Sequence, residues 1–377
     1  MKKIQLSFET EGKAIAQSLS ALVRVGDSIF AAGDEGVVLA RLKSSKDGVR
    51  FKLKELIDLS EWFDLPVPPQ KNAKQVMEID LEGMDFDYAN RLLWMVGSHS
   101  LKQGKASAAC DTKENLASLN QVKPDANRYF LGCVTLQNDD DDEFRFSRKG
   151  SKTEIRAAQL ACTAATSELM DEIRRDSLFA RYCAHSAGIP GKDNGVDIEG
   201  LACALGGRVL IGLRGPVLRG IATILEIAPQ RADSPGTKAD RLHLTKIGPN
   251  GCKYRRHFLD LCGHGIRDLC WDGGDLLILA GPTAGLDSPP LIFRWKAAIR
   301  ALGMNSSDEE KFIWRSKDQL VQEFLGSDWK QTEIGADHAE AISLFDQKRL
   351  MIGYDAPGKK RFRKPATVLV DIVDLRK

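Results

Sequence analysis

A two-strand pattern recurs along the chain, and no other feature of the sequence restricts the fold as much. Each copy has a short strand, a turn rich in Asp, Gly or Asn, and an apolar strand that ends in Gly and a polar residue. The copies lie at residues 18–34, 79–99, 196–214, 264–282 and 338–355. Repetition of one small unit is typical of folds in which a unit buries its apolar face only against its neighbours.

The spacing of the copies predicts the fold class. The aligned apolar residues are separated by 62, 117, 68 and 73 positions, and they are Leu22, Met84, Leu201, Leu269 and Ile342. Three of these intervals fit four short strands with loops, which is the size of a β-propeller blade. The sequence therefore predicts an all-β protein, a single β-propeller domain over residues 1–377. Five blades are expected, or six if the long interval contains another.

Strand-like segments at both ends of the chain suggest how the ring closes. The fifth copy is followed only by the strand-like run at 366–373, one strand short of a blade. The alternating segment Ile4–Phe8 can supply that strand, so N- and C-terminal strands are expected to pair and remove an open sheet edge.

Residues 153–182 lack Gly and Pro and are rich in Ala, Leu, Glu and Arg. This composition predicts a helical insertion over about 153–185, and a second is expected over about 296–325.

Composition narrows the functional classes. The formal net charge is only +2, which gives no indication of nucleic-acid binding. No apolar run approaches the ~20 residues of a membrane span, and the first residues alternate instead of forming a signal peptide. None of the eight cysteines forms a Cys-x-x-Cys pair. We expect a monomeric cytoplasmic protein with reduced cysteines.

The repeat register predicts which side chains share the central channel. Side chains alternate along a strand, so residues at equivalent positions of equivalent inner strands face one axis. Two residues before the aligned apolar position stand Ser20, Glu82, Glu199, Arg267 and Glu340. Two residues earlier stand Ser18, Asp80, Asp197, Gly265 and His338. The second strands end, at the same face, in Asp34, His99, Arg214 and Asp355.

This convergence of charge predicts a binding site at the channel mouth, although a hydrated channel without a ligand is an alternative. Hard cations such as calcium bind carboxylate oxygens, and Glu82, Glu199 and Glu340 are the expected metal ligands. Arginine suits phosphate or carboxylate groups. The expected ligand-binding residues are Asp80, His99, Asp197, Arg214, Arg219, Arg267, Asp268, His338 and Asp355.

Two functions fit these residues. One is a metal-dependent hydrolase that acts on a phosphoester or another small anionic substrate, with a divalent cation that polarises the substrate and activates water. The other is a non-enzymatic scaffold for a protein partner, because the sequence has no hydrolase elbow, metalloprotease helix or P-loop. No catalytic residue is assigned.

Several motifs in this order resemble an uncharacterised family labelled domain of unknown function 3616. They lie at Asp197–Ala202, Leu213–Gly220, Gly265–Leu269, Leu279–Pro282 and Glu340–Ile342, so the resemblance covers the chain from about residue 15. It implies a propeller-like fold and no established activity. The element at 199–202 also looks like one in the esterase-like phytase propellers. Arg267 departs from the Glu of the other copies, which puts a ring of carboxylates alone in doubt.

Overall fold

Strands dominate the computed structural model, which describes residues 2–69, 77–138, 144–146, 157–183, 188–283, 289–302, 309–323 and 337–375. All five copies of the repeat form antiparallel hairpins. They are β2 (Leu19–Val25) with β3 (Ser28–Gly33), β6 (Leu81–Asp87) with β7 (Leu92–Gly97), β13 (Asp197–Ala204) with β14 (Arg208–Leu218), β19 (Gly265–Asp272) with β20 (Asp275–Gly281), and β24 (His338–Asp346) with β25 (Arg349–Asp355).

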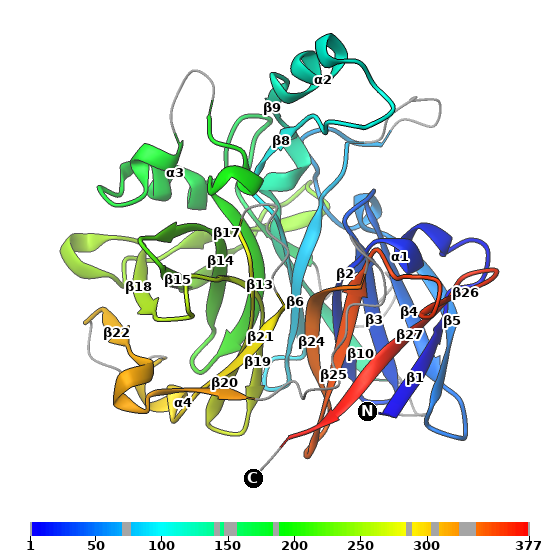
Figure 1. Ribbon diagram of the computed structural model, residues 1–377. Helices are drawn as coiled ribbons and strands as arrows, with labels where there is room; N and C mark the ends of the chain where they lie inside the picture. The colour runs from blue at the N-terminus through cyan, green and yellow to red at the C-terminus, as the bar shows by residue number, and fades with distance from the viewer. Residues whose placement is uncertain are drawn as a thin grey trace.

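Each hairpin continues outward into a sheet, which gives the molecule its propeller-like arrangement (Figure 1). β3 is followed by β4 (Val38–Ser44) and β5 (Arg50–Asp58). β7 is followed by β10 (Leu131–Asn138) and β12 (Ala157–Leu160), with β17 (Ala239–Leu244) and β16 (Pro229–Ala232) beyond them and β11 (Phe144–Phe146) beside β10. β14 is followed by β15 (Ile221–Ile227), β18 (Tyr254–Leu259) and β22 (Lys311–Ile313), and β20 by β21 (Leu291–Trp295) and β23 (Leu320–Glu323).

The first strands of the hairpins, which we call the inner strands, surround a common axis. They contact one another in the order β2, β6, β13, β19 and β24, and β24 contacts β2 again. Glycines make the approach close: a Cβ on Gly83 would lie 2.9 Å from the Leu201 Cβ, and one on Gly200 would lie 3.0 Å from Ile266. The glycine after Glu82 and Glu199 thus allows neighbouring inner strands to pack, and the core fills the spaces between sheets.

The two ends of the chain pair as the sequence predicts. β1 (Lys2–Ser7) lies antiparallel to β27 (Thr367–Asp374), with Lys2 opposite Ile372 and Ser7 opposite Thr367. β27 also pairs with β25 and with the short β26 (Phe362–Arg363). One feature was not expected. β1 pairs in parallel with β5 as well, so it joins the first and last hairpin sheets into one.

The expected helical insertions are much shorter than predicted. Within 153–185 the described residues contain strand β12, helix α3 (Glu168–Arg175) and a 3-10 turn at Ala180–Cys183. Within 296–325 they contain only the four-residue helix α4 (Ala298–Ala301), strands β22 and β23 and a 3-10 turn. The prediction of helix was therefore wrong at 157–160 and 320–323, where pairing with β10 and β21 determines the structure.

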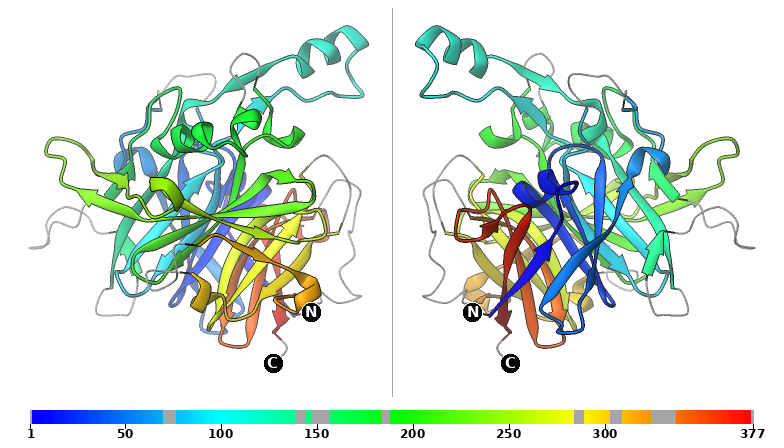
Figure 2. Two further views of the ribbon diagram at one scale, coloured as in Figure 1. Left: turned by 90° about the vertical axis from the view of Figure 1, so that its left-hand side faces the viewer. Right: turned by 90° about the vertical axis from the view of Figure 1, so that its right-hand side faces the viewer.

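A narrow extension, which we call the arm, projects from the upper side of the molecule (Figure 2, teal). It consists of β8 (Leu101–Gln103), helix α2 (Thr112–Leu119) and β9 (Val122–Pro124), and among the described strands β8 pairs only with β9. A capping box between Asp111 and Glu114 begins α2, yet no residue of this helix is buried. No helix in the described part of the chain is long and apolar enough to cross a membrane.

Candidate functional site

A β-bulge occurs at the same repeat position in every inner strand. Pairing with the second strand shifts register at the residue two before the aligned apolar position. These residues are Ser20, Glu82, Glu199, Arg267 and Glu340. A bulge changes the direction of a side chain. All five inner strands therefore redirect the side chain at the position that the repeat register aligned.

We use the name upper cluster for the charged groups near these bulges. They are Asp34, Glu78, Asp80, Glu82, Lys102, Arg128, Asp197, Glu199, Arg214, Arg267, Glu340 and Asp355. Two arginines pair with several of its acids. Arg214 Nη1 lies 3.1 Å from Asp197 Oδ2 and 2.8 Å from Glu199 Oε1. Arg267 Nη1 lies 3.1 Å from Glu199 Oε2 and 2.6 Å from Glu340 Oε1. Glu199 is 3% exposed and joins the two arginines. The structure thus brings Asp197, Glu199, Arg214, Arg267 and Glu340 together as the sequence predicted, but the arginines already bind carboxylates of the protein.

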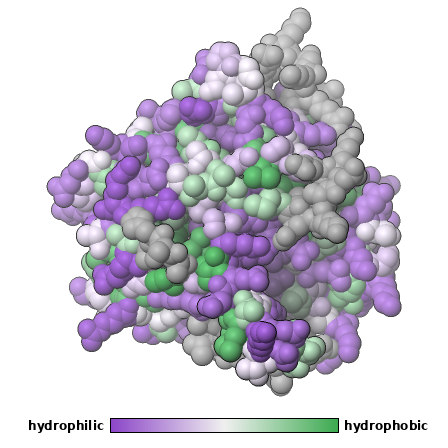
Figure 3. Space-filling model, turned by 90° about the horizontal axis from the view of Figure 1, so that it is seen from above, coloured by the Kyte–Doolittle hydropathy of each residue, from purple (hydrophilic) through white to green (hydrophobic). Residues whose placement is uncertain are grey.

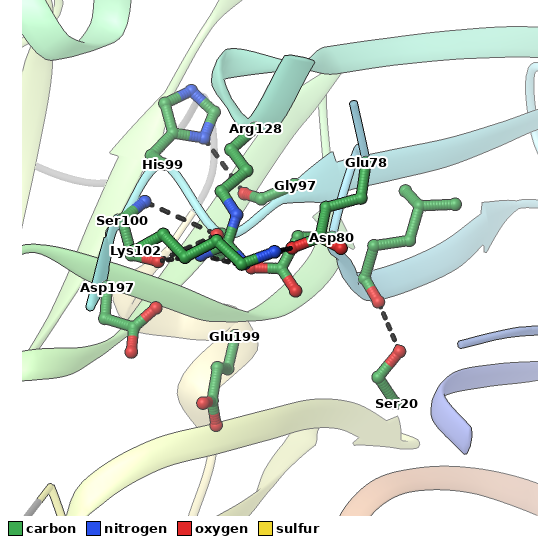
Figure 4. Close-up of polar contacts among 12 residues, drawn as sticks. Ser20, Glu78, Asp80, Gly97, His99, Ser100, Lys102, Arg128, Asp197 and Glu199 are labelled. Carbon is green, nitrogen blue, oxygen red and sulfur yellow. Dashed lines mark hydrogen bonds and ion pairs between the residues drawn. The ribbon is translucent and has the colours of Figure 1, made fainter. Parts of the chain in front are cut away.

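A third arginine of the upper cluster was missed by sequence reasoning. Arg128 lies in a 3-10 turn at Ala126–Tyr129. Its Nη1 is 3.1 Å from Asp80 Oδ2 and its Nη2 is 2.5 Å from Glu78 Oε1, which also binds Lys102 Nζ at 2.7 Å (Figure 4). Arg128 and Glu78 come from segments outside the repeat, so no register argument could place them.

Three carboxylates of the upper cluster have no ion pair in the described part of the chain: Asp34, Glu82 and Asp355. Asp34 Oδ1 is buried without a hydrogen-bond partner. Burial, with added repulsion from Glu340 and Asp34, raises the pKa of Asp355 to about 8. Burial also raises the pKa of Glu82 well above its usual value, and Asp80 and Glu199 add to this effect. The fold therefore places more carboxyl groups here than its own cations pair with, and the raised pKa values favour their neutral forms.

The paired acids also ionise with difficulty. Burial raises the pKa of Asp197 to about 7 although Arg214 opposes the shift, and it raises the pKa of Asp80 to about 6 against the effect of Arg128. Burial likewise raises the pKa of Glu340, with Arg267 acting in the opposite direction. The upper cluster therefore takes up protons near neutral pH, where isolated carboxyl groups would not.

The expected metal ligands do not form a metal-binding group. Among the described residues, no three His, Cys, Asp or Glu side chains lie close enough together to hold one ion. Arg267 lies between Glu199 and Glu340, which separates two of the three expected ligands by a cation. Glu82 shares the axis and forms no ion pair among the described residues, and the charges of Glu199 and Glu340 help burial to raise its pKa. The donor set as it stands does not fit a calcium ion.

Three predicted ligand-binding residues lie elsewhere or serve the fold. Asp268, 2% exposed, accepts hydrogen bonds from the backbone N–H groups of Leu269 and Ile342 at 2.8 and 2.7 Å, which ties β19 to β24. Arg219 is exposed in the turn between β14 and β15. His338 begins β24 opposite Asp355 and forms no ion pair with the described acids. Alternation correctly placed His338 near the upper end, but the loop position of Arg219 gave no such constraint.

His99 is near the upper cluster but does not face its acids. Its Nδ1 bonds to the carbonyl oxygen of Gly97 at 2.9 Å. In Figure 4 the imidazole lies apart from the carboxylates of Asp197 and Glu199. The surrounding face, seen from above, is mainly hydrophilic (Figure 3).

Comparison with known proteins agrees with the repeat motifs. A family model described as protein of unknown function, DUF3616, matches residues 18–371. The chain belongs to this family. A search of curated proteins gave no match.

Several solved structures are distantly similar to this chain. A protein from Lactobacillus plantarum is 11% identical with a TM-score of 0.32, and the match covers 89% of this chain and 63% of that one. A PQQ-bound aldose sugar dehydrogenase from Streptomyces coelicolor is 10% identical with a TM-score of 0.33 and 99% coverage of both chains. A putative 6-phosphogluconolactonase from Bacteroides uniformis is 10% identical with a TM-score of 0.31, covering 94% of this chain and 70% of that one. Similarities this low transfer no activity to the DUF3616 chain.

Proposed function

We propose that the upper cluster binds a small cationic ligand. The observation that carries the proposal is a difference in pairing: Arg128, Arg214 and Arg267 are paired, whereas Asp34, Glu82 and Asp355 have no ion pair among the described residues. A cation placed among the unpaired acids would favour their ionised forms and lower their raised pKa values. Binding would then release protons near neutral pH.

The chemical class that fits best is an organic polyammonium. Its charges are separated along a flexible chain, so they can reach carboxylates that do not converge on one point. A single metal ion needs converging oxygens, and the described residues have no such group. An anionic substrate would have to compete with Asp197, Glu199 and Glu340 for the arginines. We therefore propose binding, and we assign no hydrolytic step.

Calorimetric titration at pH 7 with putrescine and, separately, CaCl₂ tests the proposal. We expect putrescine to bind and Glu82→Gln to weaken it at least about tenfold, the size expected for loss of a charged hydrogen bond. The matched control is Glu61→Gln, an exposed acid far along the chain from the inner strands. Calcium binding that depends on Glu82 would assign a metal instead. Absence of binding by either probe would overturn the proposal.

A scaffold function has one specific observation in its favour, the arm. Leu116 and Leu119 are 62% and 43% exposed on α2, although the helix is well capped. Exposed leucines on a projecting helix suit contact with a partner protein. A photo-crosslinking residue at 116 should capture a discrete partner in cells. The same residue at exposed Glu61 is the control, and identical patterns would argue against the arm.

We also propose that the propeller has five blades. Five inner strands contact one another in a closed ring, from β2 to β24 and back to β2. The sheet that β1, β5 and β27 share also supports this number. An experimental structure with a further inner strand between β6 and β13 would require six.

A further inference from the structure

A cavity of about 470 Å³ lies beside the upper cluster, at the root of the arm. Its walls come from the arm (Leu101 and Val122–Pro124), from α3 (Met170 and Arg174), and from Tyr129, Tyr182, Ile189 and Val196. Most of these side chains present apolar or aromatic surface. Cavities of this size with few polar groups are typical of small-molecule sites.

One polar group in the wall of this cavity has an unmet hydrogen-bonding requirement. His99 is 2% exposed, and its Nε2 is buried with no hydrogen-bond partner. Its backbone is held in the left-handed region with φ 54°, and its ring meets Tyr129 edge to face at 6.0 Å. A buried polar atom without a partner is costly, so the position requires an explanation.

The other ring nitrogen determines what kind of partner Nε2 needs. Nδ1 lies 2.9 Å from the carbonyl oxygen of Gly97, which can only accept, so Nδ1 carries the proton. In the neutral ring Nε2 is then an acceptor. Burial lowers the pKa of His99 to about 4, which keeps the ring neutral in the physiological range. The missing partner is therefore a hydrogen-bond donor.

Two cations add a second chemical requirement. Lys123 is an exposed residue of the cavity wall, and Arg174, whose side chain is about a third exposed, also lines it while its Nη1 lies 3.4 Å from Asp171 Oδ1. A ligand with a negative group could place it near these residues while its body packs against Met170, Ile189 and the tyrosines. The expected ligand charge is therefore opposite to that of the upper cluster, where carboxyl groups of the protein outnumber their cationic partners.

We propose that this cavity is a second binding site, for a small aromatic hydroxy acid whose hydroxyl donates to His99 Nε2 and whose carboxylate lies near Lys123 and Arg174. The ring occupies the apolar part of the cavity. The site is separate from the proposed cation site, and neither depends on the other.

Titration calorimetry at pH 7 with 4-hydroxybenzoate and benzoate tests the hydroxyl directly. We expect 4-hydroxybenzoate to bind about tenfold more tightly, the difference expected for one hydrogen bond to a buried acceptor. His99→Asn suits the left-handed backbone but has too short a side chain to replace Nε2. It should reduce 4-hydroxybenzoate to the affinity of benzoate and leave benzoate unchanged. The control is His243→Asn, an exposed histidine that lines a different cavity.

A second variant keeps the test decisive if His99→Asn does not fold. Ala165 is exposed at the edge of the cavity, so Ala165→Trp should fill the entrance, abolish binding of both probes and leave the melting temperature unchanged. Equal affinities of the two probes for the unmodified protein would overturn the proposal. So would failure of both to bind at millimolar concentration, or unchanged binding after Ala165→Trp.

Discussion

The two ends of the inner strands differ in how their polar groups are used. At the upper end, Asp34, Glu82 and Asp355 have no ion pair among the described residues. At the lower end, a cavity of about 450 Å³ is lined by residues of all five inner strands or their turns. There Asp85 accepts from the backbone N–H of Cys203 at 2.7 Å and of Phe86 at 2.8 Å, and Trp271 Nε1 donates to the Cys203 carbonyl oxygen at 2.7 Å.

The polar groups at one end of the inner strands therefore serve the fold, whereas those at the other end are candidates for binding. Polar groups at the lower end connect neighbouring inner strands, as when Ser343 Oγ accepts from the Arg24 N–H at 3.1 Å. The upper end includes acids that form no ion pair with any of the described residues. Groups that do not contribute to stability are the ones expected to contribute to binding.

The largest expected effect on stability comes from replacing Arg267, which pairs with both Glu199 and Glu340. Arg267→Ala should lower the free energy of unfolding by about 3 kcal/mol, because it leaves Glu199 and Glu340 buried without their shared partner. Urea unfolding at pH 7 measures the change. Arg219→Ala, at an exposed turn, should stay within about 0.5 kcal/mol. Equal effects of the two substitutions would mean that Arg267 has no special role.

Removing Asp268, which links β19 to β24 by hydrogen bonds, should cause a smaller loss of stability and no loss of putrescine binding. Asp268→Ala leaves the N–H groups of Leu269 and Ile342 without their acceptor, at a cost of about 2 kcal/mol. Asp268→Asn keeps one acceptor oxygen and should cost less. Affinity for putrescine should be unchanged in both. A variant that remains folded but fails to bind would return Asp268 to the candidate site.

The acids of the upper cluster should make stability depend on pH. The pKa of Asp355 is about 8 in the folded chain against an ordinary value of 3.8, so the native state holds this proton more tightly. Stability from this group is present at low pH and is lost as pH rises from about 4 through 8. Asp355→Asn should therefore stabilise the protein by about 1–2 kcal/mol at pH 8.5, since partial contact with water reduces the full effect, and much less at pH 5. Unfolding curves at pH 5, 7 and 8.5 would show parallel losses if Asp355 did not contribute.

The smallest effect is expected at Lys192, an exposed residue whose charge lowers the pKa values of Asp34 and Asp355. Lys192→Gln should raise both pKa values, so the decline in stability should begin at the same pH and continue to a higher pH. Thermal melts across the same pH range measure this shift. A shift to lower pH would show that Lys192 acts through some other contact.

The repeat explains which parts of this arrangement could be predicted. The repeat register and the alternation of side chains placed Glu199, Arg267 and Glu340 on one axis, because equivalent residues of equivalent strands face the same way. Composition failed at Ala157–Leu160, where helix-forming residues lie between β10 and β17. Arg128 was missed because it comes from a connecting segment. Pairing partners such as Arg214 with Asp197 depend on distances that register does not give.

The position of β1 has a consequence for how the chain is made. The ribosome makes β1 long before β27, its antiparallel partner. At typical rates of synthesis the interval is roughly 20 to 70 s. During that time only β5, the parallel partner, is available to hold β1. The nascent chain therefore keeps an unfinished strand edge until β27 has been made, and a factor that shields β1 during this interval should raise the yield of folded protein.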